Sequence, residues 1–116
     1  MADVLPATVA LTLYRGDTRI WEDLFTVDGA PMPLAGYTFL AQIRATADAE
    51  PMATIDVEVI DAPAGRIRRT LTATEAAKLV PGRNVWDMQF TNGDGYTRTV
   101  MAGPVVVRAD VSRDEP

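Results

Sequence analysis

Apolar and polar residues alternate with a period of two along most of the chain. This is the pattern of β-strands that bury one face and expose the other. Turn residues separate the alternating segments at regular intervals, which is typical of a β-sandwich or barrel. The predicted strands are Thr8–Tyr14, Thr18–Val27, Tyr37–Thr46, Ala53–Ile60, Arg66–Leu71, Asn84–Thr91, Tyr96–Met101 and Val105–Val111.

Glycine and proline mark the connections between these strands. Asp28–Gly36 is the clearest loop, Asn92–Gly95 predicts a tight hairpin, and Gly103-Pro104 predicts a bulge or kink. One short helix is expected at Thr74–Leu79. Thr72 is placed as its N-cap and Glu75 as the third helical residue, which together form a capping box.

The alternation also assigns faces. The inward members of the clearest strands are predicted to form the core: Phe39, Ile43, Ile55, Val57, Trp86 and Met88. The Thr18–Val27 strand is apolar on both faces, since Trp21 and Phe25 share one face with Asp23, while Ile20 and Leu24 share the other with Glu22. It is therefore either covered on both sides or turned outward toward a partner.

These elements predict an all-β fold: an antiparallel, immunoglobulin-like β-sandwich of about eight strands with one short helix. The 116 residues suit a single domain, 1–116, with residues 1–7 and 112–116 as terminal tails.

Composition argues against an enzyme. The chain has no histidine and no cysteine, Ser112 is its only serine and Lys78 its only lysine, so the usual nucleophiles, bases and metal ligands are scarce. We expect no catalytic residues, no cofactor and no metal. A net charge of −5 disfavours nucleic acid as a partner. No apolar run and no signal pattern predicts a membrane or a secretory route, so synthesis in a cytoplasm is expected.

Several short motifs have two explanations each. Arg15-Gly16-Asp17 matches an integrin-binding tripeptide but also suits a hairpin turn. The residues around Asn92 and Asp94, with Asp87, offer oxygens for calcium or the side-chain bonds of a tight hairpin. Asp56 and Glu58 share one face of a predicted strand, where they suit acid–base chemistry or an ordinary solvated face. Arg66 and Arg68, on the next strand, are placed to form ion pairs with them.

Arg69 is harder to place, because it shares a face with Ile67 and Leu71. We expect it at the rim of the sandwich, with its stem packed and its charged head in water, or in a contact between subunits.

Taken in order, the segments resemble a family of small β-sandwich domains in tailed-bacteriophage virions. These are the N-terminal domain of baseplate upper proteins and the related domain of tail-fibre connector and collar proteins. The segments that carry the resemblance are Gly16-Asp17-Thr18, Pro33-Leu34-Ala35-Gly36-Tyr37-Thr38 with Gln42-Ile43-Arg44, Gly65-Arg66-Ile67, Leu71–Leu79, Trp86-Asp87-Met88, and Gly103–Val107 with Asp110–Arg113.

The resemblance implies a non-enzymatic docking or connector module, located in the virion and bound to other virion structural proteins in multiple symmetric copies. A capsid decoration protein is an alternative, and a carbohydrate- or ligand-binding β-sandwich is an alternative from another class. Lysine and proline protect a strand at a sheet edge from pairing with another chain. Edge strands that lack them favour binding by strand addition, in which a strand of the partner joins the sheet. The residues assigned to a protein interface are Ile20, Trp21, Leu24, Arg69, Val105 and Val107.

Overall fold

A computed structural model of the chain describes residues 7–111. Residues 1–6 and 112–116 of the predicted tails, Ser112 among them, lie outside these residues. Ala7, which the prediction placed in the N-terminal tail, belongs to a strand. The regular secondary structure of the described part is almost entirely β, and its one helix is far too short to cross a membrane. The elements are β1 Ala7–Thr8, β2 Leu11–Tyr14, β3 Arg19–Leu24, β4 Thr26–Val27, β5 Ala30–Pro31, β6 Thr38–Arg44, β7 Pro51–Asp61, β8 Arg66–Leu71, α1 Ala73–Ala76, β9 Gly82–Thr91 and β10 Thr97–Arg108.

Eight of the strands form one strongly curled sheet, a half-barrel, in the order β1-β10-β9-β6-β7-β8-β3, with β2 also paired to β10. The sheet is mixed, because β1 and β2 run parallel to β10 while the other pairs are antiparallel. The predicted antiparallel arrangement therefore holds for most of the sheet but not at this edge. Antiparallel neighbours can be joined by tight turns, whereas the β1 and β2 pairings join opposite ends of the sequence.

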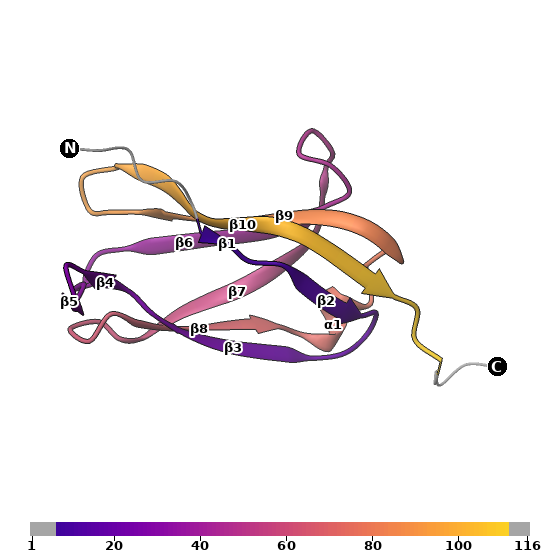
Figure 1. The fold of residues 1–116 in the computed structure, drawn as a ribbon, viewed down its shortest axis with the longest axis horizontal. Coiled ribbons are helices and arrows are strands. Elements are labelled where there is room, and N and C mark those ends of the chain that lie inside the picture. Colours follow the sequence, from indigo (N-terminus) through magenta and orange to yellow (C-terminus); the bar gives the residue numbers. More distant parts are fainter. Residues whose placement is uncertain (1–6, 112–116) are drawn as a thin grey trace.

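Strand β7 curls the sheet. Its first half, Pro51–Ile55, pairs with β6, and its second half, Asp56–Asp61, pairs with β8. Figure 1 shows β7 passing between an upper layer of β6, β9 and β10 and a lower layer of β3 and β8. The predicted strand Ala53–Ile60 matches β7 in position and in which side chains point inward. Nothing in the sequence indicates that the strand pairs with β6 in one half and with β8 in the other.

The core lies inside the curl. Ile43, Ile55, Trp86 and Met88 are buried there as predicted, and Phe39 and Val57 pack against them while partly exposed. The faces follow the alternation in the sequence, because each inward residue on β6, β7 and β9 is followed by an outward one.

The predicted break at Gly103-Pro104 is displaced. Strand β10 continues through both residues, and its register shift lies at Thr99–Met101. The opposite strand breaks instead, since β1 ends at Thr8 and β2 begins at Leu11 with the same register against β10. That register sets Val9 opposite Gly103. The Val9 N–H donates to the Ala102 carbonyl at 2.9 Å, but the Val9 carbonyl finds no donor at Pro104, which has no N–H.

Gly103 allows the chain to approach closely at this break. A Cβ on Gly103 would overlap the Val9 carbonyl oxygen. The same oxygen accepts a 2.8 Å hydrogen bond from the indole N–H of Trp86. Gly103 therefore leaves room for the backbone segment that satisfies a core tryptophan.

The predicted loop Asp28–Gly36 contains a small hairpin. Strands β4 and β5 pair across Asp28 and Gly29, whose φ angles of 52° and 81° are both positive. Positive φ at both central residues is the mark of a type I′ turn.

The helix has the predicted N-cap but spans Ala73–Ala76 rather than Thr74–Leu79. Thr72 caps α1 by accepting a hydrogen bond from the Glu75 N–H. The Glu75 carboxylate does not close a capping box. It accepts instead from the backbone N–H of Thr54 on β7 at 2.8 Å and from Lys78 at 2.5 Å. The hydrogen bond from Lys78, followed by that from Thr54, lowers the pKa of Glu75 below its usual 4.5.

Gly103→Ala should destabilise the protein by about 1–3 kcal/mol, because the new methyl group must displace the Val9 backbone. Gly93→Ala is the matched control, since nothing lies within 4 Å of its Cβ position. Denaturant unfolding measures both. Equal stability of the two variants would contradict the close approach.

Glu75→Gln should lower the free energy of unfolding at neutral pH, because glutamine keeps an acceptor for Thr54 but loses the charge that Lys78 contacts. The lowered pKa means that this stabilisation is present above pH 4.5 and is lost as pH falls through the folded-state pKa. The difference from wild type should therefore shrink on acidification. In urea titrations across this range, a constant difference would refute the charge contribution, and Glu50→Gln, at an exposed position, serves as control.

Candidate functional site

The lower layer presents a face that is partly apolar and partly charged. Ile20 and Leu24 project outward from β3 and are 58% and 60% exposed. The strand is therefore not covered on both sides: among residues 7–111 nothing covers the outward face of β3. Trp21, Asp23 and Phe25 lie on the inner side.

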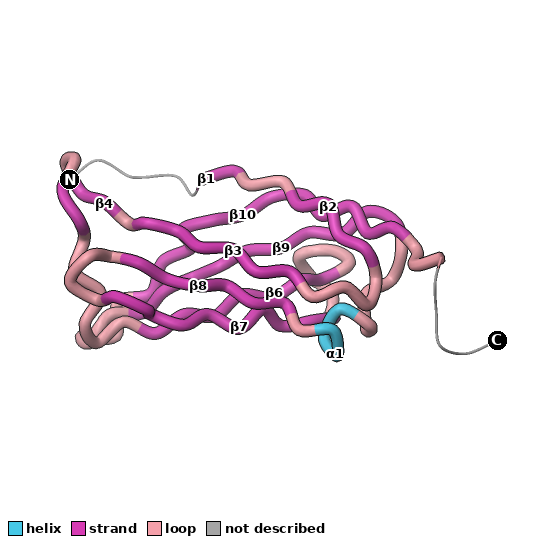
Figure 2. Tube along the Cα trace, turned by 90° about the horizontal axis from the view of Figure 1, so that it is seen from below, coloured by secondary structure: helices cyan, strands magenta, loops and turns pink. Residues whose placement is uncertain are grey.

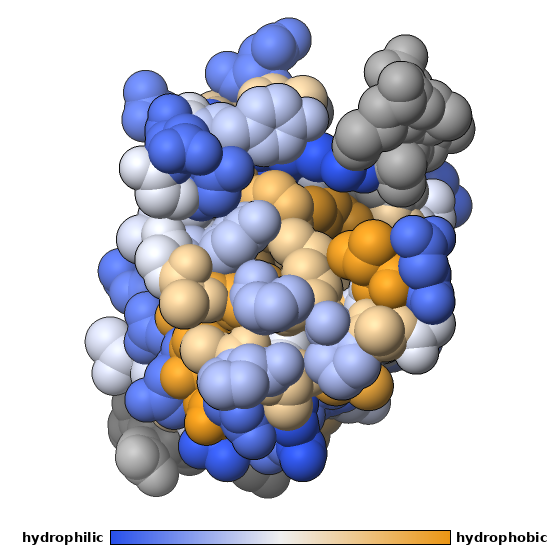
Figure 3. All heavy atoms as spheres, turned by 90° about the vertical axis from the view of Figure 1, so that its left-hand side faces the viewer, coloured by the Kyte–Doolittle hydropathy of each residue, from blue (hydrophilic) through white to orange (hydrophobic). Residues whose placement is uncertain are grey.

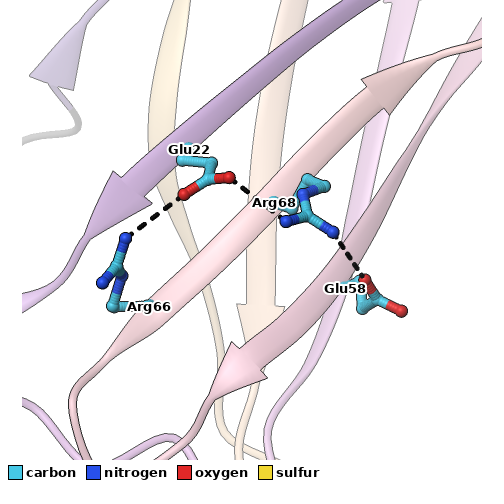
Figure 4. A network of polar contacts seen from close by, with 4 residues as sticks. All are labelled: Glu22, Glu58, Arg66 and Arg68. Atoms are coloured by element: carbon cyan, nitrogen blue, oxygen red, sulfur yellow. Dashed lines mark hydrogen bonds and ion pairs between the residues drawn. The ribbon is translucent and has the colours of Figure 1, made fainter.

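An ion chain crosses this face beside the apolar pair. Glu22 lies between Arg66 at 3.3 Å and Arg68 at 3.2 Å, and Arg68 also reaches Glu58 at 3.7 Å (Figure 4). The predicted pairing of Arg68 with Glu58 is confirmed, but Arg66 pairs with Glu22 rather than with β7. All four side chains are substantially exposed, so each pair stabilises the fold only slightly.

Strand β3 is also an edge of the sheet. It pairs with β8 on one side, and no strand of the described chain pairs with its other side. Figure 2 shows β3 and β8 side by side at the front of the molecule. An exposed apolar pair and an unpaired backbone edge thus lie on the same short strand.

Arg69 lies inside the curl, so the prediction that its head reaches water at a rim is wrong. The residue is 3% exposed, and its guanidinium bonds both oxygens of Asp23, at 2.6 and 3.1 Å. It also lies between two indole rings, 4.9 Å from the centroid of Trp21 and 5.3 Å from that of Trp86. Its Nη1 is buried and has no hydrogen-bond partner.

The sequence itself indicates this ion pair. Asp23 shares a strand face with Trp21 and Phe25, and Arg69 shares a strand face with Ile67 and Leu71. A charge on an inner face needs a partner of opposite sign, because burial of an isolated charge is very costly. The register between β3 and β8, which sets Trp21 opposite Arg69 and so brings Asp23 within reach, comes only from the structure.

The remaining residues assigned to an interface do not join this face. Val105 and Val107 are 0% and 3% exposed and belong to the core. Strand β10 is paired on both sides, to β9 and to β1 and β2, so it offers no free edge there. Trp21 is partly buried beneath the guanidinium of Arg69, with Arg19 also 5.2 Å from its ring.

A shallow groove of about 680 Å³ lies on the outer face of the upper layer. Its walls combine apolar and polar residues from β6, β9 and β10, among them Leu40, Gln42, Val85 and Asp87. The one aromatic residue in its lining is Trp86, which is 3% exposed and points into the core. The groove therefore offers no ring on which a sugar could stack.

One end of the curl is filled by aromatic rings. Phe25, Phe39 and Tyr37 surround Phe90, with centroid separations from it of 6.3, 6.2 and 5.0 Å. Figure 3 shows apolar side chains in the middle of this end with polar ones around them. The packing is edge-on or tilted, as in ordinary cores, and gives no sign of a ligand.

The short motifs adopt their structural alternatives. Arg15-Gly16-Asp17 is a turn in which the Asp17 N–H bonds Tyr14 and the Arg15 side chain bonds Asp110 at 2.9 Å. Asn92 Oδ1 accepts from the N–H groups of Asp94 and Tyr96, as in a tight hairpin. Asp56 and Glu58 lie on the exposed face of β7, and no group of three metal-ligating side chains gathers within residues 7–111.

A scan against family models and a search of curated proteins find no match to this chain.

Asp23→Asn should lower the free energy of unfolding by about 3–5 kcal/mol, since it leaves the Arg69 charge buried without a counter-ion. The double variant Asp23→Leu/Arg69→Met should recover most of that loss, because it removes both charges together. Chemical denaturation of Asp23→Leu, Arg69→Met and the double variant gives the coupling energy. A loss below about 0.5 kcal/mol for Asp23→Asn would show that the pair behaves like a surface ion pair.

Proposed function

We propose that this chain is a non-enzymatic docking module of a tailed-bacteriophage virion, which joins components of the tail, baseplate or fibre. The observation that carries the proposal is the outward side of β3, where Ile20 and Leu24 are exposed beside an unpaired strand edge. Exposed apolar side chains next to free backbone groups are what strand-addition interfaces use. The resemblance in segment order to virion β-sandwich domains supplies the biological setting.

The proposal includes the fold type to which the curled sheet belongs. We infer that the curled sheet is a variant of an immunoglobulin-like sandwich whose two layers share β7. Support comes from the exchange of partners along β7 and from the parallel pairing of β2 with the last strand. A capsid decoration protein would use the same surface and would differ in its place in the particle.

The groove over β6, β9 and β10 favours a second candidate, a ligand-binding β-sandwich. Its volume lies within the range of small-molecule sites. Its lining lacks an exposed aromatic ring, which counts against a carbohydrate ligand.

The test is incorporation into purified particles of a phage that encodes this chain, with cryo-electron microscopy to locate it. Ile20→Lys and Leu24→Lys should each reduce the copy number per particle at least about tenfold, because a desolvated lysine costs more than 1.4 kcal/mol at an apolar contact.

Val80→Lys is the matched control, since Val80 is 57% exposed but lies outside β3, in the connection between α1 and β9. Absence of the wild-type chain from particles would overturn the proposed setting. Normal incorporation of both lysine variants would overturn β3 as the docking surface.

A further inference from the structure

The backbone direction of β3 can be assigned from one hydrogen bond. The Phe25 N–H donates to the Gly65 carbonyl, which lies on the side of β8. In an antiparallel ladder, alternate residues direct both backbone groups to the same neighbour. Arg19, Trp21 and Asp23 therefore bond β8, and the N–H and C=O groups of Ile20, Glu22 and Leu24 point to the free edge.

The side chains of these same three residues project to the outer face, in the order apolar, acidic, apolar. This order is symmetric about Glu22. If a second β3 lay antiparallel along the edge with Glu22 opposite Glu22, each Ile20 would face a Leu24. Directly opposed side chains in such a pair lie about 4.5–5.5 Å apart at Cβ, within apolar contact.

Charge does not prevent this arrangement. The two Glu22 carboxylates would meet at the axis, but each already lies between Arg66 and Arg68. Inward-pointing charges commonly protect an edge against pairing. On β3 that charge is Asp23, and it is bonded by Arg69 inside its own fold.

We propose that two copies of this chain pair through β3, by antiparallel strand addition about a twofold axis at Glu22. The proposal deepens the docking function and rests on it for the choice of β3 as the interface. The β3 edge joins the two copies, and the outer faces of the two paired strands, with Ile20 and Leu24, remain exposed to contact another component. A twofold contact uses the same patch on both copies, so every substitution in β3 acts twice in the dimer.

Cysteine substitution tests the register directly, because the natural chain has no cysteine. In the proposed dimer the two copies of residue 22 form a hydrogen-bonded pair with Cα atoms about 5.5 Å apart, within disulfide range. Glu22→Cys should form a covalent dimer under mild oxidation at least about tenfold faster than Val80→Cys at the same concentration. Val80 has a similar exposure to Ile20 but lies outside β3.

Hydrogen exchange of the wild-type protein gives a second readout that does not depend on a variant. The amides of Ile20, Glu22 and Leu24 should exchange rapidly in dilute protein and become protected as concentration rises. Those of Trp21 and Asp23, bonded to β8, should be protected throughout. Rapid exchange of the first three at every concentration, with monomer mass by light scattering, would overturn the dimer.

Protection of the edge amides without a Glu22→Cys dimer would overturn the register about Glu22. Both results concern the isolated protein. A monomer that still enters particles through β3 would refute this inference and leave the docking function standing. A dimer that never enters particles would refute the docking function and leave this inference standing.

Discussion

Arg69 is the charged group around which the two layers are assembled. Its carboxylate partner, Asp23, lies on β3, and the rings that enclose it belong to β3 and β9. Trp86, one of those rings, donates in turn to the Val9 carbonyl, which fits only because residue 103 is glycine. A single guanidinium thus connects the lower layer, the upper layer and, through Trp86, the segment between β1 and β2.

Such a core is less tolerant than a purely apolar one. Apolar side chains of similar size can replace one another at modest cost, because packing is non-directional. The Arg69 guanidinium needs a carboxylate in the plane of its N–H groups and an aromatic ring at each of two fixed positions beside it. The unbonded Nη1 shows that even this arrangement leaves one donor unsatisfied, compensated in part by the rings. The pair therefore specifies which strands lie together more than it adds to stability.

The strands, their inner faces and the helix cap were predictable, because alternation and capping are local. Ile43, Ile55 and Met88 are examples that period-two patterning alone assigns correctly. What sequence could not supply is pairing over long separations. The exchange of partners along β7, the parallel docking of β2 on β10 and the meeting of Asp23 with Arg69 all depend on register between distant segments. The placement of Val105 and Val107 on an interface failed for this reason, since a valine-rich strand has the same sequence at an edge as in the middle of a sheet.

The parallel pairing of β1 and β2 with β10 has a mechanical consequence. The first and last strands of residues 7–111 lie side by side and point the same way. Tension that draws the beginning of β1 away from the end of β10 slides these strands along each other, so it loads their hydrogen bonds together rather than one at a time. The other strands of the sheet, from β9 to β3, are loaded only after that ladder has sheared. A fold with this arrangement is suited to carry load along its long axis, which spans 53 Å.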